Sequence, residues 1–240
     1  MKTEVPVQRK IRRSRRQRKL AKRRVKKRAK KQVKEEGVSP LVEKYWLRRY
    51  DLFSKYDEGV KLDEEGWFSV TPEEIAVRHA ERSGGGVVVD CFAGVGGNSI
   101  QFAKMCYHVV AIDIDPQKVE MALSNAKVYG VEDYVDFIVG DFIQLAPSLK
   151  ITLSREALVR ECYAVREQIV RYSLFQIAQT ITPNIIMFLP RNVDLLQVEE
   201  LSWLSSPPLC VEIEKNYLNG YLKGITVYFG DAAFGKMELS

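Results

Sequence analysis

Three aspartates and one glycine-rich turn are spaced regularly between residues 87 and 141. Asp90 ends a first run of β-branched residues, and the glycine-rich turn 94–97 follows it. Asp113 ends a second such run, and Asp141 follows a third. Glycines let backbone N–H groups approach a ligand closely, and an acid that closes the second strand of such a unit accepts hydrogen bonds from ribose hydroxyls. These residues predict a nucleotide-binding site.

The elements that must position these side chains can be read from the same stretch. Residues 87–90 predict a strand, Ile100–Cys106 a helix, and Val109–Ile112 a second strand, which is the βαβ unit of an α/β protein. Tyr134–Val139 predicts a third strand. The three acids then lie at the carboxyl ends of successive strands, the edge where open α/β sheets bind ligands.

Two cofactors compete for this unit. A dinucleotide site requires G-x-G-x-x-G, but here Gly94 and Gly96 are followed by Gly97, Asn98 and Ser99, so the third glycine of that pattern is absent. The pattern D-x-F-x-G-x-G-G-N instead resembles the first motif of the S-adenosylmethionine-dependent methyltransferases, which favours that cofactor over NAD. A unit without any ligand is disfavoured, because three glycines would then only add unfolded-state entropy.

Charge is distributed unevenly along the 240 residues. Residues 1–36 hold 18 Lys and Arg against three acids, whereas the remainder holds 19 against 28, so a basic arm precedes an acidic body within a net charge of +6. Charge this dense predicts a disordered arm. Its expected partners are RNA phosphates or the nuclear import machinery, and a merely solubilising tail is the alternative.

Several function classes are disfavoured by composition. No apolar run reaches the roughly 18 residues that a membrane-spanning helix needs, and the N-terminus lacks the apolar core of a secretory signal. The four cysteines are scattered without C-x-x-C spacing, which is typical of a reduced, intracellular protein and argues against a zinc site. His79 and His108 stand alone, so no metal is expected.

The flanking segments predict further elements. The region 41–56 has apolar and aromatic residues at helical spacing, 59–70 is expected to be a loop or short hairpin, and Thr71-Pro72 begins another helix. Near the C-terminus we expect a strand at Asn184–Leu189 and a helix at Val193–Trp203. An antiparallel hairpin is expected from Val211–Tyr217 and Ile225–Phe229, with its turn at Asn219-Gly220.

A longer set of motifs resembles the trimethylguanosine synthases, a family of RNA cap guanosine-N2 methyltransferases. The matching pieces are KYWLRRYDLFSKYDEGVKLDEEGWFSVTPE, VVVDCFAGVGGNSIQFA, VVAIDIDP, NAKVYG, VGDF and NIIMFLPRN. The resemblance implies a class I methyltransferase fold, an α/β protein with a mostly parallel, Rossmann-like sheet. It also implies three parts: the basic arm 1–36, a helical N-terminal extension 37–82, and the methyltransferase domain 83–240.

The resemblance also implies roles for individual residues. Those implied to hold S-adenosylmethionine are Thr71, Asp90, Phe92, Gly94, Gly96, Asn98, Asp113 and Asp141. Phe53 is implied to line the cofactor or catalytic pocket. The residues implied to bind the cap phosphates are Lys44, Arg191 and Lys223. For Lys44 and Lys223, the alternative is that each is an ordinary exposed lysine.

Residues 150–172 depart from the family pattern. Relatives carry a fourth strand there that ends in Ser-Pro-Pro-Trp, whose tryptophan stacks on the methylated guanine. Here the segment has no Pro, Gly or Trp, and its apolar spacing predicts an amphipathic helix, which would leave a gap in the sheet. Residues 149–153 are a candidate substitute strand, which would bring Ser154 to the position of the lost serine.

The leading hypothesis is therefore methyl transfer from S-adenosylmethionine to the N2 amine of the 7-methylguanosine cap of small nuclear and nucleolar RNAs, impaired by the loss of Ser-Pro-Pro-Trp. Two alternatives remain open: a methyltransferase for another RNA amine such as adenine, and a non-catalytic RNA-binding protein on the same fold. We expect a monomer in the nucleus, chiefly the nucleolus, with the cytoplasm as a further compartment.

Overall fold

The computed structural model describes residues 38–152, 158–161 and 168–234, in two compact units. The first unit ends at Leu47 and contains the short helix α2 (Glu43–Trp46), whose end is capped by a hydrogen bond from the Leu47 N–H to the Glu43 carbonyl at 3.0 Å. The second unit begins at Arg48.

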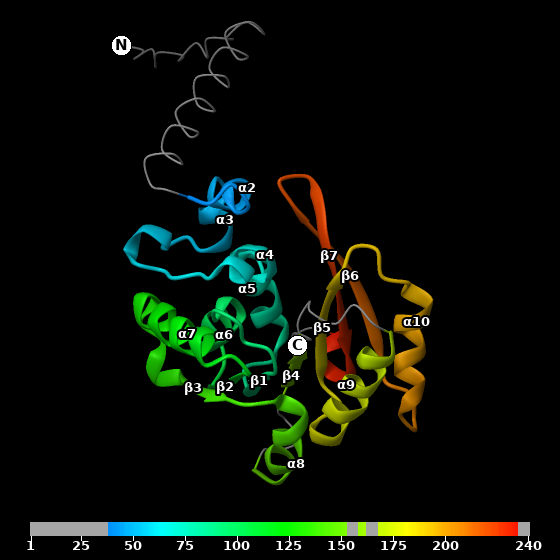
Figure 1. Ribbon diagram of the computed structural model, residues 1–240. Helices are drawn as coiled ribbons and strands as arrows, with labels where there is room; N and C mark the ends of the chain where they lie inside the picture. Colours follow the sequence, from blue (N-terminus) through cyan, green and yellow to red (C-terminus); the bar gives the residue numbers. More distant parts are fainter. Residues whose placement is uncertain (1–37, 153–157, 162–167, 235–240) are drawn as a thin grey trace, which may run out of the picture. The chain divides into compact units, whose positions relative to one another are not determined.

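The second unit is built on a seven-stranded sheet (Figure 1). The strands are β1 (Val87–Asp90), β2 (His108–Asp113), β3 (Val135–Val139), β4 (Leu158–Glu161), β5 (Ile185–Pro190), β6 (Val211–Leu218) and β7 (Tyr221–Phe229). Their order is β3-β2-β1-β4-β5-β7-β6. Strands β1 to β5 are parallel, and β7 is antiparallel to both β5 and β6. This confirms the predicted α/β fold with a mostly parallel sheet.

Alternate residues of the strands face opposite layers of helices. One face holds the large apolar core, where Val89, Met187 and Val227 lie in one buried cluster with Phe142 and Phe175. The helices on that face are α8 (Phe142–Thr152), α9 (Gln168–Ile181) and α10 (Leu195–Glu200). The helices associated with the other face are α5 (Glu73–Arg82), α6 (Gly97–Ala103) and α7 (Pro116–Tyr129).

Short elements complete the unit. They are α3 (Arg49–Leu52), η1 (Tyr56–Glu58), α4 (Glu64–Ser69), η2 (Glu132–Tyr134), η3 (Leu201–Leu204) and η4 (Gly230–Ala233). None of the helices within the described residues is both long and apolar enough to span a bilayer.

Local sequence signals account for several boundaries. Helix α7 begins where the Asp115 carboxylate accepts a hydrogen bond from the Gln117 N–H at 2.8 Å, and it ends at Gly130 with φ of 69°. The β6–β7 hairpin turns at Asn219 and Gly220, whose φ values of 52° and 79° are those a two-residue hairpin turn favours. This turn was predicted and is confirmed.

The prediction of a helix in place of the fourth strand is wrong. Strand β4 lies between β1 and β5 and pairs with both, so the ladder has no gap among the described residues. The buried backbone groups of β1 and β5 need partners, and this demand outweighs the helical spacing of the segment. Residues 149–152 belong to α8 and provide no substitute strand. Ser154, as well as the basic arm, lies outside the described residues.

The N-terminal segment also differs from expectation. The single helix expected over residues 41–56 is divided into α2 and α3, because Arg48 leaves the helical region with φ of −123° and ψ of 20°. The loop or hairpin expected over 59–70 contains α4, which the Asp63 carboxylate caps by accepting the Gly66 N–H at 2.8 Å. Helix α5 begins at Glu73 with Pro72 as its N-cap residue, one position later than predicted.

Candidate active site

The glycine-rich turn is fixed by backbone geometry that only glycine tolerates well. Gly94 and Gly96 have φ of 53° and 87°. A side chain at Gly96 would also meet Ala122 of α7 at 3.1 Å, whereas the space around Gly94 is open. The Gly94 N–H donates to Asp113 at 2.7 Å, which ties the turn to the end of β2. The turn thus presents an open face at the carboxyl edge of the sheet.

The two strand-end aspartates occupy different environments. Asp90 is fully buried and accepts a hydrogen bond from the Ser99 hydroxyl at 2.7 Å. Asp113 is 9% exposed, and its carboxylate accepts the N–H groups of Gly94 at 2.7 Å and Asp115 at 3.0 Å. A carboxylate offers about four acceptor positions, so Asp113 retains capacity for the two hydroxyls of a ribose.

Asp141 lies at the same edge, directly after β3 and Gly140. The Gly140 N–H donates to the Asp113 carbonyl at 2.9 Å, which brings the third strand end beside the second. The Asp141 carboxylate is half-buried and accepts the Ile143 N–H at 2.9 Å, so it also caps α8. The three predicted acids therefore share one edge of the sheet.

Phe53 and Thr71 come to the glycine-rich turn from the segment that precedes the sheet. A side-chain carbon at Gly97 would lie 2.6 Å from Val70, 3.6 Å from the Thr71 carbonyl and 3.8 Å from the Phe53 ring. Phe53 and Thr71 are both 1% exposed. The structure thus brings both predicted residues against the turn, and Gly97 is the residue that permits this close approach.

A set of hydrogen bonds that the sequence did not predict holds Phe53 in this position. The Glu73 carboxylate accepts hydrogen bonds from the backbone N–H and the hydroxyl of Ser54, the latter at 2.9 Å, and from the Tyr129 hydroxyl at 2.9 Å. Burial raises the pKa of Tyr129 to about 12, so its phenol remains a donor at neutral pH. Because these residues are 19 and 56 positions from Glu73, no local spacing could have revealed the cluster.

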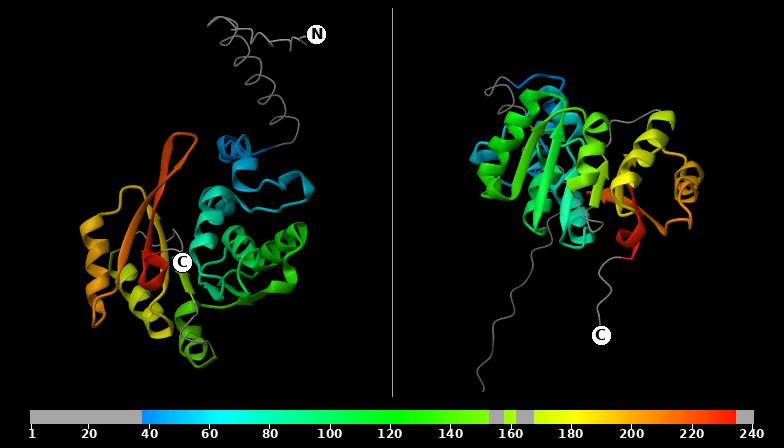
Figure 2. Two further views of the ribbon diagram at one scale, coloured as in Figure 1. Left: turned by 180° about the vertical axis from the view of Figure 1, so that it is seen from behind. Right: turned by 90° about the horizontal axis from the view of Figure 1, so that it is seen from below.

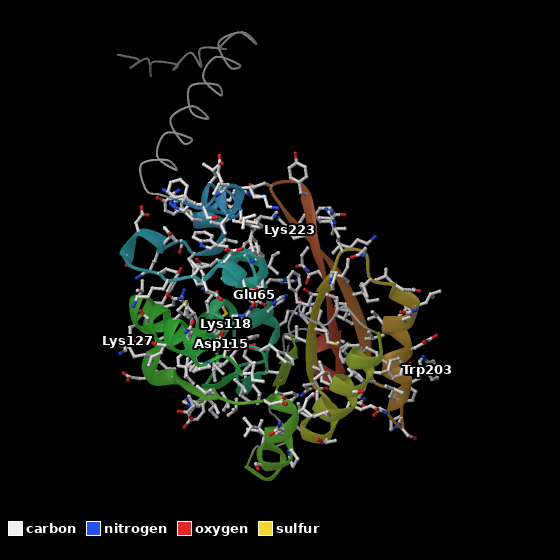
Figure 3. The ribbon with its side chains drawn as sticks, viewed as in Figure 1. Glu65, Asp115, Lys118, Lys127, Trp203 and Lys223 are labelled. Atoms are coloured by element: carbon white, nitrogen blue, oxygen red, sulfur yellow. The ribbon has the colours of Figure 1, made fainter. Side chains whose placement is uncertain are left out.

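A second cluster fixes the segment 59–70 over the turn. The Asn125 side chain accepts the Lys61 N–H at 2.7 Å and donates to the carbonyls of Lys61 and Val95 at 2.9 Å each. Lys118 of α7 pairs with Glu65 of α4 at 2.6 Å (Figure 3). The Asn125 contacts give the NAKVYG piece a structural role, which is to hold the segment 59–70 beside the glycine-rich turn.

Asn98 and Phe92 point away from solvent near the turn. The Asn98 side-chain oxygen lies 3.3 Å from the His79 Nδ1, and the His79 Nε2 lies 2.8 Å from the Thr226 hydroxyl. This network joins α6, α5 and β7. Phe92 is half-buried and meets Phe142 edge-on with 6.2 Å between ring centroids. Sequence reasoning missed His79, because a lone histidine carries no pattern.

Basic side chains gather where β5 ends. Arg191 follows Pro190, and Pro190 pairs with Gly224 of β7, so Lys223 lies at the same level of the sheet as Arg191. Burial lowers the pKa of Lys223, and the nearby cations Arg48 and Arg191 lower it further, while Asp51 opposes them. The sequence predicted Arg191 and Lys223 but missed Arg48.

Lys44 is the remaining predicted phosphate residue. It lies on α2 in the first unit, where its ammonium group is 4.6 Å from the centroid of the Tyr45 ring. Among the described residues, no group of three or more His, Cys, Asp or Glu side chains is arranged to hold a metal ion.

Comparison with known proteins identifies the family to which this chain belongs. Residues 85–232 match the family model described as RNA cap guanine-N2 methyltransferase. The chain belongs to that family. It is therefore an S-adenosylmethionine-dependent methyltransferase that acts on the guanine N2 of an RNA cap, which favours the first of the three hypotheses above.

Curated relatives extend this RNA cap guanine-N2 methyltransferase match beyond the domain. The trimethylguanosine synthase of Schizosaccharomyces pombe is 36% identical over 80% of this chain and 87% of its own length. The trimethylguanosine synthase of Saccharomyces cerevisiae is 31% identical over 80% of this chain and 68% of its own length.

Solved structures support the fold of this cap methyltransferase. A putative methyltransferase from Porphyromonas gingivalis superposes with a TM-score of 0.63 at 15% identity, and the match covers 78% of this chain but only 48% of that one. The O-methyltransferase TomG from Streptomyces achromogenes, solved with S-adenosylmethionine, gives 0.53 at 13% identity over 80% and 90% of the two chains. At such identities the likeness concerns the fold alone.

Proposed function

We propose that this enzyme converts the 7-methylguanosine cap of small nuclear and nucleolar RNAs to the trimethylguanosine cap, and that it does so in the nucleus, chiefly the nucleolus. The observation that carries the proposal is one shared edge of the sheet. Asp113 and the glycine-rich turn lie at the end of β1 and β2, and Arg191 and Lys223 lie at the end of β5. A methyl donor and an anionic cap would meet between them. Two relatives named as trimethylguanosine synthases support the trimethylguanosine product.

The residues on the cofactor side fit S-adenosylmethionine. Asp113 has acceptor capacity left for ribose hydroxyls, and the open space at Gly94 accommodates a ligand against the backbone. Asp141 is half-buried near Asp113 and would be the residue at this edge to accept a hydrogen bond from the adenine amine. Asp90 acts through Ser99, which its buried carboxylate orients.

The main task of the protein in this reaction is to position the cofactor and the cap. When bound, the cofactor would supply an electrophilic methyl group: the guanine N2 amine would form a bond to the methyl carbon as the carbon–sulfur bond breaks, the neutral thioether would leave, and N2 would release a proton to solvent water. Holding donor and acceptor in line accounts for most of the rate in such a transfer. Phe53 closes the turn to water, the Glu73 cluster holds Phe53, and Arg191 and Lys223 fix the cap phosphates by charge-assisted hydrogen bonds. No general base is assigned.

The missing Ser-Pro-Pro-Trp segment predicts a weak grip on the cap base. Stacking of a base on an aromatic side chain contributes about 1–3 kcal/mol, and a positively charged methylated base gains a further cation–π attraction. Strand β4 restores the sheet but supplies no such tryptophan within Leu158–Glu161. We therefore expect a higher KM for the cap and a lower turnover than a stacking tryptophan would give.

A methyl-transfer assay tests the proposal. The full chain would be incubated with labelled S-adenosylmethionine and either 7-methylguanosine triphosphate, unmethylated GTP or ATP, and the product analysed by mass spectrometry. Transfer to the N2 amine of the methylated cap alone is expected, and an Asp113→Asn variant should lose it. Transfer to ATP in place of the cap would support the adenine alternative instead, and cofactor binding without any transfer would contradict the proposal.

The RNA class and compartment need a cellular test. A fluorescently tagged chain should concentrate in the nucleolus, and a variant without residues 1–36 should not, because that segment carries the basic charge. Immunoprecipitation of trimethylguanosine-capped RNA from depleted cells should show a loss of small nuclear and nucleolar species. Unchanged levels of these species would contradict the proposed substrate class.

A further inference from the structure

The β6–β7 hairpin extends past the sheet at the edge that holds the site. Strand β7 pairs with β5 only from Phe229 to Gly224, which is opposite Pro190 at the carboxyl end of β5. Residues 217–223 therefore continue beyond β5, paired only within the hairpin. Both the front view and the view from behind show the hairpin protruding beyond the neighbouring strands (Figures 1 and 2). This protruding part, residues 217–223, is called the hairpin tip below.

The hairpin tip carries two exposed tyrosines on opposite faces. Tyr221 is 71% exposed and Tyr217 is 57% exposed. Tyr217 pairs with Leu222, and Leu218 pairs with Tyr221. Since paired residues of an antiparallel ladder share a face and neighbours along a strand alternate, the two rings point to different sides of the hairpin. Exposed aromatic rings of this kind are the surfaces on which nucleic-acid bases stack.

Polar contacts hold the hairpin tip beside the basic cluster. The Asn219 amide donates to the Asp51 carboxylate at 3.1 Å, and the Arg48 Nε donates to the same oxygen at 3.0 Å. The buried Arg48 Nη2 has no hydrogen-bond partner within the described part of the chain, so this guanidinium is not saturated by Asp51. Arg48 and Lys223 are close enough for their charges to interact. The tip is thus anchored, with cations at its base and an aromatic ring further out.

We infer that the hairpin tip binds the RNA nucleotide that follows the cap, with Tyr221 as the stacking surface for its base. The inference rests on the proposed function, because the cap base must lie by the cofactor and the cap phosphates by Arg191 and Lys223. A strand advances about 3.3 Å per residue, so Tyr221 lies roughly 7 Å beyond Lys223, further past the carboxyl end of β5. A free 7-methylguanosine triphosphate ends at the phosphates and does not reach Tyr221, whereas a capped RNA does.

Steady-state kinetics with two substrates test this inference in the full chain. One substrate is 7-methylguanosine triphosphate and the other is a short RNA with the same cap. Tyr221→Ala should raise KM for the capped RNA about 5- to 150-fold and leave KM for the free cap unchanged. Tyr221→Trp should retain the affinity for capped RNA, because an indole also stacks. Tyr217→Ala is the matched control, since it removes a comparably exposed ring from the other face.

The substrate comparison separates the possible outcomes. The basic arm is present in every variant, so its general attraction to RNA cancels when variants are compared at one salt concentration. Equal KM changes for both substrates, or none for either, would overturn the inference. If Tyr221→Ala does not fold, photocrosslinking of the wild-type chain to capped RNA with 4-thiouridine as the first nucleotide decides it, and an adduct outside residues 217–223 would contradict it. If neither substrate is methylated, the proposed function fails, and the same crosslink still tests where the capped RNA binds.

Discussion

The cofactor side and the cap side of the site are built in different ways. On the cofactor side, strand, turn and helix follow one another in sequence, and Asp90 and Asp113 are satisfied by groups within about 20 residues of them. On the cap side, the basic residues come from the end of β5, from β7 and from the segment before α3, and the strand that should lead to the stacking aromatic is only four residues long. On the first side, the strand-end acids and the glycine-rich turn are held by local hydrogen bonds, and only the segment that covers them is held by distant residues. On the second side, the basic residues themselves are brought together by distant elements.

This difference predicts that damage to one side should leave binding on the other side intact. It also predicts that single substitutions on the cofactor side strongly weaken cofactor binding, because the buried carboxylates there have specific partners. On the cap side, the affinity for the cap should fall in small steps as single cations are removed.

The largest effect is expected for Asp113→Asn. The amide keeps the shape but cannot accept two N–H groups and two ribose hydroxyls, and a hydrogen bond to a charged group contributes about 1.5–3 kcal/mol. We expect the dissociation constant for S-adenosylmethionine to rise roughly a hundredfold, as measured by calorimetry. Asp136→Asn, which alters an exposed acid of β3, is the control. Equal cofactor affinity in Asp113→Asn and wild type would remove Asp113 from the site.

A smaller effect is expected when the support of Phe53 is removed. Glu73→Ala loses the hydrogen bonds to Ser54 and Tyr129 and should lower the free energy of unfolding by about 2 kcal/mol, because the half-buried Tyr129 hydroxyl and the exposed Ser54 both lose a charged acceptor. Denaturant titration measures this change. Glu74→Ala is a close control, since the neighbouring side chain is exposed. An equal decrease in the free energy of unfolding in both variants would show that the Glu73 hydrogen bonds do not stabilise the fold.

Arg191→Gln tests the cap side. Loss of one charge-assisted contact should raise KM for 7-methylguanosine triphosphate about tenfold, while the dissociation constant for S-adenosylmethionine stays unchanged. Lys127→Gln removes one positive charge from α7, at the left of Figure 3 and apart from Lys223, and should alter neither constant. A loss of cofactor affinity in Arg191→Gln would contradict the separation of the two sides.

A further effect concerns pH. The pKa of Tyr129 in the folded protein, about 12, lies above its ordinary value of about 10, with burial as the main cause. Its contribution to stability is therefore complete below about pH 10 and is lost as the pH rises through 12. The free energy of unfolding should decline over that range in the wild type and less steeply in Tyr129→Phe. If the free energy of unfolding declined equally with pH in the two proteins, the Tyr129 phenol would not be the group whose pKa is raised.

Much of the fold could be predicted from the sequence, because its signals are local. The acids after β1, β2 and β3, the glycine-rich turn and the Asn219-Gly220 hairpin all depend on neighbours in the chain. Strand β4 could not be predicted in the same way. Its four residues form a strand because β1 and β5 offer unpaired backbone groups on either side, and this demand is invisible in a pattern of apolar spacing.

The site residues differ in the same way: those with local signals could be predicted, and those that depend on distant contacts could not. Asp113 and the turn were predicted from their motif, whereas Glu73 gave only the signal of an acid at a helix start, although it joins Ser54 and Tyr129 across the site. Arg48 was missed because its role depends on Asp51 and on Asn219, which is 168 residues away from Asp51. Long-range contacts of this kind require the folded chain.

One pair of titrations tests the central claim most directly. S-adenosylmethionine and then 7-methylguanosine triphosphate would be titrated calorimetrically into the same preparation of the full chain. We predict that the cofactor binds at one site per chain and that the cap binds weakly, at least tenfold more weakly than the cofactor, because residues 150–172 contain no tryptophan that could stack on the cap base. Tight binding of the cap without measurable binding of the cofactor would contradict the account.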